Sequence, residues 1–223
     1  LCTTFLTLSN ALAVDIFKND TNATGLLDVN SWVGGVIPGT SDVAVWDSTV
    51  ATADQSALPS LGTNTTFAGI RIANPISNVG FSVNNSRALS LGTSGIDMSA
   101  ATVNLTVGGL GILRPTGSST SSFSVASGRT LTINAQFQAT SGTTTVNFPG
   151  AGSVNINKLP ASTSLKLINN GNGTLTLNGT TATTGGMIVN GGLVQVGTGG
   201  ATGVLPTGNI SLAAGSRVSL NNT

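Results

Sequence analysis

The chain has 223 residues and a net charge of +1; 7% of its residues are charged, 39% are hydrophobic and 30 are glycine. An average globular domain carries about 25% charged residues, so this composition excludes a charge-rich helical bundle, a coiled coil and a charged disordered tail. The chain also lacks the basic surplus that nucleic-acid binding requires, and no nucleic-acid partner is expected.

The acidic residues are all aspartates, and histidine, glutamate and tyrosine are absent from the sequence. All seven aspartates lie within residues 1–97, whereas residues 98–223 contain only basic charged residues. A paired-carboxylate site needs two acids close together, so any such site is confined to the first 97 residues. Histidine, glutamate and tyrosine are the side chains on which much general acid–base catalysis depends, and none is present. We therefore expect neither catalytic residues nor a cofactor.

Residues 1–13 form an apolar stretch that ends in Ala11-Leu12-Ala13, a pattern typical of a signal-peptidase site. We expect it to be the remainder of a secretory signal cleaved after Ala13; an N-terminal strand or helix of the mature protein is the alternative. The stretch is too short to span a bilayer. Cys2 is the only cysteine, so the chain after it has neither a disulfide nor a thiolate metal site.

Residues 14–60 are predicted to form a cap-like segment. Its two tryptophans, Trp32 and Trp46, are expected to pack as a hydrophobic cap over the first coil; stacking on a sugar is the alternative and makes them weak ligand-binding candidates. Asp42, Asp47 and Asp54 are weak candidates for calcium binding, but their spacing matches no known calcium loop, so no metal site is expected.

Short apolar-polar-apolar triplets recur through residues 61–223, and their period of two indicates strands with one buried face. They start every seven to eleven residues and are too short to form a stable sheet unless neighbours stack, which leaves a β-sandwich or a β-solenoid. Examples are Phe81-Ser82-Val83, Leu89-Ser90-Leu91, Ile96-Asp97-Met98, Leu131-Thr132-Ile133, Leu175-Thr176-Leu177 and Val194-Gln195-Val196.

A repeated sequence motif favours the solenoid over the sandwich. Asparagine follows an apolar-x-apolar triplet at positions 84, 134, 157, 178, 190 and 221. Asparagine tolerates the left-handed conformation at a corner, and stacked asparagines form amide ladders. Ordinary turn chemistry without stacking is the alternative.

Residues 172–179 (NGTLTLNG) and 184–197 (TGGMIVNGGLVQVG) resemble the autotransporter-associated β-strand repeat, and residues 203–212 (GVLPTGNISL) continue the likeness. The repeat is best matched at 170–222. Residues 30–47 (NSWVGGVIPGTSDVAVWD) resemble the opening of many large secreted proteins that carry this repeat. The resemblance implies an all-β, right-handed parallel β-helix, with a β-sandwich as the alternative, in a protein exported to the bacterial cell surface.

The resemblance also implies a non-enzymatic structural or adhesive stalk, with a surface polysaccharide or a host or neighbouring cell as its partner. The alternative is a carbohydrate-active β-helix, either a polysaccharide lyase or hydrolase or a carbohydrate-binding module. Asp97 with Arg87, or Asp42 with Asp47, could serve such an enzyme, although aspartates in turns are the commoner explanation.

Residues 14–223 are expected to make nine or ten coils. The last two strand segments, 210–212 and 218–220, alternate apolar and polar residues as the interior coils do. We therefore expect an open C-terminal coil that favours self-association.

Overall fold

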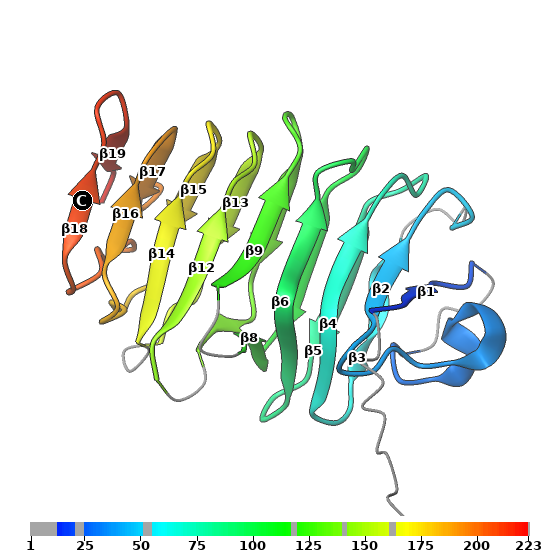
Figure 1. The fold of residues 1–223 in the computed structure, drawn as a ribbon. Helices are drawn as coiled ribbons and strands as arrows, with labels where there is room; N and C mark the ends of the chain where they lie inside the picture. The colour runs from blue at the N-terminus through cyan, green and yellow to red at the C-terminus, as the bar shows by residue number, and fades with distance from the viewer. Residues whose placement is uncertain are drawn as a thin grey trace, which may run out of the picture.

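The computed structural model describes residues 13–20, 25–50, 55–116, 120–139, 142–160 and 164–222, which form a parallel β-helix (Figure 1). The strands of its larger sheet lie side by side in one row, perpendicular to the long axis of a rod. All pairings between the named strands are parallel, so the solenoid prediction is confirmed and the β-sandwich alternative is wrong for the described residues.

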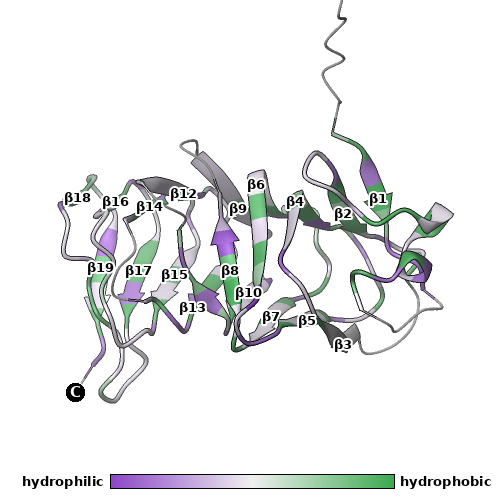
Figure 2. Ribbon diagram, turned by 90° about the horizontal axis from the view of Figure 1, so that it is seen from below, coloured by the Kyte–Doolittle hydropathy of each residue, from purple (hydrophilic) through white to green (hydrophobic). Residues whose placement is uncertain are grey.

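Two walls enclose the core. The large sheet contains β1 (Asp15–Phe17), β2 (Val43–Trp46), β4 (Thr65–Ile72), β6 (Ala88–Met98), β9 (Thr120–Val125), β12 (Thr144–Phe148), β14 (Leu165–Asn169), β16 (Met187–Val189) and β18 (Ile210–Leu212), with β8 (Ile112–Pro115) and β11 (Gln136–Phe137) as a side branch. The small sheet contains β3 (Gln55–Leu61), β5 (Val79–Val83), β7 (Leu105–Gly109), β10 (Thr130–Ile133), β13 (Ser153–Ile156), β15 (Thr174–Leu177), β17 (Leu193–Val196) and β19 (Arg217–Leu220). Figure 2 shows the two sheets facing each other, with alternating polar and apolar bands along strands such as β17.

Stacking in register builds a single continuous core. Leu175 of β15 pairs with Val194 of β17, and Leu177 pairs with Val196; all four side chains are at most 1% exposed, as predicted. Gln195, at the outward position between the two valines, is half-buried. The triplet pattern predicts that Thr176, between Leu175 and Leu177, faces outward and is exposed; it lies at the outward position but is also buried.

Asparagine ladders connect successive coils. The Asn157 side-chain amide donates to Asn134 Oδ1 over 2.6 Å, and a second column runs from Asn190 through Asn170 to Asn147 over 2.6 and 2.7 Å. The predicted stacking is therefore confirmed for Asn134, Asn157 and Asn190, whereas Asn178 accepts from the hydroxyls of Thr198 and Thr202. The left-handed conformation is not confirmed, because Ser86 is the sole non-glycine with positive φ in the described part of the chain. Glycines occupy the left-handed corners instead.

The large sheet branches at β6. This branch, together with the residues before β2, takes up residues that the estimate of nine or ten coils assigned to full coils, so the coils number about eight. The phrases 89–91 and 96–98, separate in the sequence prediction, belong to this one strand; its first half pairs with β8 and its second half with β9. β9 consequently begins 32 residues after β6, whereas the other strands of the large-sheet path from β2 onward begin 21 to 24 residues apart. The excess residues between β6 and β9 include β8, and its partner β11 belongs to the next coil, between β10 and β12.

An aromatic cluster covers the N-terminal end of the core. Trp32 lies between η1 (Val29–Ser31) and η2 (Val33–Gly35), is 1% exposed, and donates from Nε1 to the Leu26 carbonyl over 2.9 Å. Its ring meets the rings of Trp46 and Phe67 edge-on at 5.7 and 6.4 Å. Trp32 therefore lies over the first coil, whereas Trp46 belongs to the coil itself as the last residue of β2. The stacked strands thus begin within residues 14–60.

Trp32→Ala is expected to lower the free energy of unfolding by roughly 3–5 kcal/mol, because it removes a fully buried indole and leaves a cavity at the end of the core. Chemical denaturation measures the effect. The neighbouring Val33 is 58% exposed, so Val33→Ala should change stability by less than about 0.5 kcal/mol. Equal effects from the two substitutions would contradict the capping role.

Lys18 is buried beside the same cluster, with 1% of its surface exposed, and its Nζ donates to the Asn19 carbonyl over 2.9 Å. Burial lowers the pKa of Lys18 below its ordinary value, and the charge of Asp20 offsets part of this shift. Between the lowered pKa and about 10.4 the unfolded chain binds more protons than the native chain, so stability rises with pH in that window.

Raising the pH from about 8 to 10.5 should therefore increase the free energy of unfolding through Lys18, and Lys18→Met should remove this increase. Histidine and tyrosine are absent, which leaves few other groups to titrate over the same range. Chemical denaturation at several pH values provides the measurement. An unchanged pH dependence in the variant would show that Lys18 is not the source.

The last coil leaves apolar side chains uncovered. Ile210, Leu212 and Leu220 continue the inward columns of Met187, Val189 and Val196, yet they are 37%, 51% and 62% exposed. Val218 is partly buried against the core. The C-terminal end of the described rod is therefore an open apolar cross-section, as the sequence predicts.

Candidate functional site

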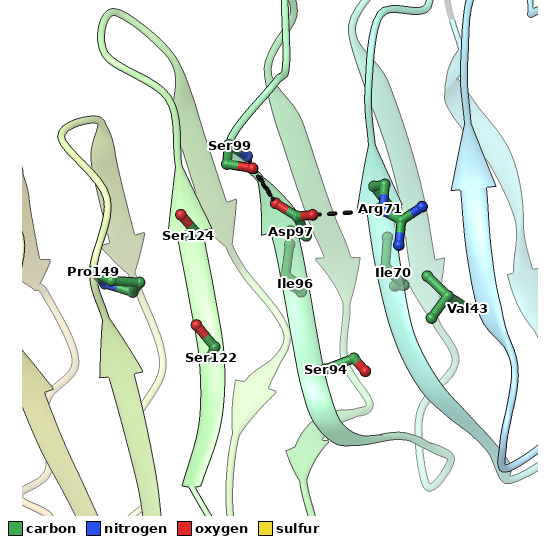
Figure 3. A pocket seen from close by; sticks show the side chains of 10 residues that line it. All are labelled: Val43, Ile70, Arg71, Ser94, Ile96, Asp97, Ser99, Ser122, Ser124 and Pro149. Carbon is green, nitrogen blue, oxygen red and sulfur yellow. Dashed lines mark hydrogen bonds and ion pairs between the residues drawn. The ribbon is translucent and has the colours of Figure 1, made fainter. Parts of the chain in front are cut away.

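A groove of about 400 Å³ lies on the outer face of the large sheet, across β2, β4, β6 and β9 (Figure 3). Two glycines create it. Gly69 of β4 and Gly95 of β6 are paired in register, at outward positions between Val43 of β2 and Ser122 of β9. Because these two adjacent positions carry no side chain, the outer surface of the large sheet is recessed there.

A bulge in β6 requires both glycines. Phe67 pairs with Leu91 and Gly69 pairs with Gly95, so three residues of β6 lie opposite one residue of β4. A Cβ atom at Gly69 would lie 2.7 Å from the Cβ of Ser94, and one at Gly95 would lie 2.1 Å from the Ser122 carbonyl oxygen. Gly95 also has a positive φ of 58°. The sequence Gly92-Thr93-Ser94-Gly95 therefore shapes the groove within a strand rather than forming a loop between two strands.

An arginine between two aspartates lines one side of the groove. Arg71 Nη1 contacts Asp15 Oδ2 at 2.5 Å, and Arg71 Nε faces Asp97 Oδ2 at 3.5 Å. The Arg71 and Asp97 side chains are 37% and 42% exposed, so these ion pairs contribute little to stability and remain accessible from solvent. The cluster has one more negative charge than positive charge.

Hydroxyl groups line the rest of the groove. The Ser99 hydroxyl donates to Asp97 Oδ1 over 2.6 Å, which orients the carboxylate from the end of β6. Ser122 and Ser124 project from β9 on the opposite side, and Ser94 projects from the bulge (Figure 3). Ile70 and Ile96 belong to the core beneath the groove, and Pro149 marks its far end. The groove thus combines a charged pair and hydroxyls above an apolar base.

The pairing of Asp97 with Arg87 considered from the sequence is wrong, because the ion-pair partner of Asp97 is Arg71. Residues one coil apart are brought into register in a parallel β-helix, and Arg71 pairs with Asp97 across β4 and β6. Arg87 lies in the turn before β6, where its backbone amide donates to Asn84. The separation of Arg71 and Asp97, close to one coil length, is the sequence signal that points to this pair.

The other candidate residues lie outside the groove. Trp32 and Trp46 are buried and expose no ring face for a sugar. Asp42 accepts from the Gly39 amide, and Asp47 accepts from the amide and hydroxyl of Thr49, so both carboxylates organise local turns. Asp54 lies outside the described residues. Among the residues that the structure describes, no group of three or more potential metal ligands comes together.

The chain matches no protein-family model, and neither the curated proteins nor the solved structures contain a match to it. None of the helices within the described ranges is long and apolar enough to cross a membrane.

Proposed function

We propose that this chain is a non-enzymatic stalk segment of an exported, autotransporter-like bacterial surface protein, where it spaces or presents adhesive contacts. The observation that carries the proposal is the continuous stack of eight coils on one apolar core. In such a solenoid each coil contacts mainly its neighbours, so length is added without a new fold. The repeat resemblance at 170–222 and the A-x-A pattern at Ala13 support the surface location.

The regular walls also suit a load-bearing element. Backbone hydrogen bonds between coils run along the rod, from Lys18 to the Val45 carbonyl at one end and from Asn221 to the Val196 carbonyl at the other. Asparagine amide bonds reinforce the coils between them. A force that pulls along the axis would therefore act on the hydrogen bonds between each pair of successive coils.

Surface display provides the test. The full chain is placed between an outer-membrane anchor and an epitope tag on a Gram-negative bacterium, and adhesion is measured to polysaccharide-coated and cell-coated surfaces. Displayed wild type should adhere above the level of the anchor with the tag alone. Val194→Asp, which disrupts the stack, should lose the gain even at equal display.

The same preparation is incubated with acidic polysaccharides and assayed for new reducing ends and unsaturated uronates. Catalytic turnover would favour the alternative, a polysaccharide lyase or hydrolase. Wild-type display that confers no adhesion would contradict the adhesive role.

A further inference from the structure

We propose that the groove on the large sheet binds a neutral, hydroxyl-rich glycan that lies along the axis of the rod. The inference rests on the proposed adhesive function and deepens it by assigning a ligand class and a site. Its volume of about 400 Å³ falls within the range of small-molecule sites and accommodates a few sugar rings of a longer chain.

The hydrogen-bonding groups of the groove complement those of sugars. Arg71 supplies only donors and Asp97 only acceptors, whereas the hydroxyls of Ser122 and Ser124 supply both. Sugar hydroxyls likewise donate and accept. Ser124 is in register with Asp97, which is in register with Arg71, so donors and acceptors alternate across three successive strands.

The spacing of these groups favours an extended chain. Neighbouring strands are separated by ~4.8 Å, close to the advance of one sugar unit in an extended glycan. A glycan crossing β4, β6 and β9 therefore meets one polar side chain per sugar as it runs along the rod.

The charge of the groove distinguishes between glycan classes. Asp15 and Asp97 outnumber Arg71, so the local field disfavours uronates and sulfated sugars. Because both tryptophans are buried, binding relies on hydrogen bonds rather than ring stacking. A single groove should therefore bind weakly, with Kd near 1 mM, and many copies on one cell would give avidity.

The test titrates the full 223-residue chain with three tetrasaccharides, monitored by saturation-transfer NMR and calorimetry. Two are neutral, the β-1,4-linked tetramers of glucose and of N-acetylglucosamine; the third is the α-1,4-linked tetramer of galacturonate. At least one neutral tetramer should bind more tightly than galacturonate. Failure of both neutral tetramers to bind at ~20 mM, well above the expected Kd, would overturn the proposal, as would tighter galacturonate binding.

Ser122→Phe fills the groove from β9 and should weaken neutral-glycan binding roughly tenfold or more, because a sugar ring and its hydrogen bonds are displaced. Ser82→Phe is the matched control, since Ser82 is also a half-buried serine between two buried strand residues but lies on β5 of the other wall. It should leave affinity within about twofold. Unchanged affinity in Ser122→Phe would reject the site.

Arg71→Met retains the aliphatic stem but removes the donors, and serves as a second variant if Ser122→Phe folds poorly. It should also reduce affinity several-fold, and full retention would count against the site. The adhesion assay separates the two proposals. Displayed wild type that adheres although no neutral tetramer binds would reject the groove and leave the stalk intact.

Discussion

Val194→Asp is expected to lower the free energy of unfolding by at least about 3 kcal/mol, because it places an ionisable group without a partner in the apolar core. Val194 is fully buried between Leu175 of the preceding coil and Val218 of the following coil. Chemical denaturation followed by circular dichroism measures the loss. Since each coil supports its neighbours, the defect should also loosen the coils beyond it.

Gln195→Asp is the matched control, because it introduces the same side chain one residue away on the outward face. The Gln195 amide donates to the Gly197 carbonyl over 2.9 Å, so the substitution removes one half-buried hydrogen bond. The expected cost is about 1 kcal/mol. Comparable losses from the two substitutions would refute the assignment of inward and outward faces.

The second large effect is concentration-dependent self-association of residues 14–223 through the last coil. Ile210, Leu212 and Leu220 form an uncovered apolar cross-section, and β18 and β19 have strand neighbours on one side only. Open edges of this kind promote edge-to-edge pairing. Sedimentation velocity should show a sedimentation coefficient that rises with protein concentration.

Replacing both Leu212 and Leu220 by lysine should keep the chain monomeric at little cost in stability, because both side chains are already more than half exposed. Val36 is 53% exposed at the N-terminal end, so Val36→Lys is the control and should associate like wild type. Wild type that remains monodisperse, with its last two strands protected from hydrogen exchange, would show that this coil closes itself.

The regular part of the fold could be predicted from alternation alone. Triplets such as 175–177 and 194–196 have one buried face, and a one-coil shift aligns them with their neighbours. Asparagines at a constant position after the triplets revealed the stacking, because side-chain ladders need equivalent positions in successive coils. Local patterns were sufficient wherever one coil repeats the previous coil.

The groove could not be predicted in the same way. Gly92-Thr93-Ser94-Gly95 has the composition of a turn, yet tertiary pairing with β4 on one side keeps it within a bulged strand. The ion pair of Arg71 with Asp97 depends on that bulge, because the extra residues set which side chains become neighbours. A periodic sequence pattern predicts only a regular strand register. It therefore could not predict the bulge or the groove that the bulge forms.

The aromatic cluster makes the N-terminal end of the rod differ from the C-terminal end as a template for folding. Trp32 covers the first coil and Trp46 stacks toward Phe81 of the small sheet, at a centroid distance of 6.4 Å, so both tryptophans lie at the end formed by the N-terminal part of the chain. A second aromatic cluster, Phe123 with Phe137 and Phe148, lies farther along the rod. A nucleus formed at the N-terminal end has one face blocked by the indole and one face available as a template. Coils should therefore be added from the N-terminal end toward the C-terminal end, with each completed turn supplying the edge on which the next one forms.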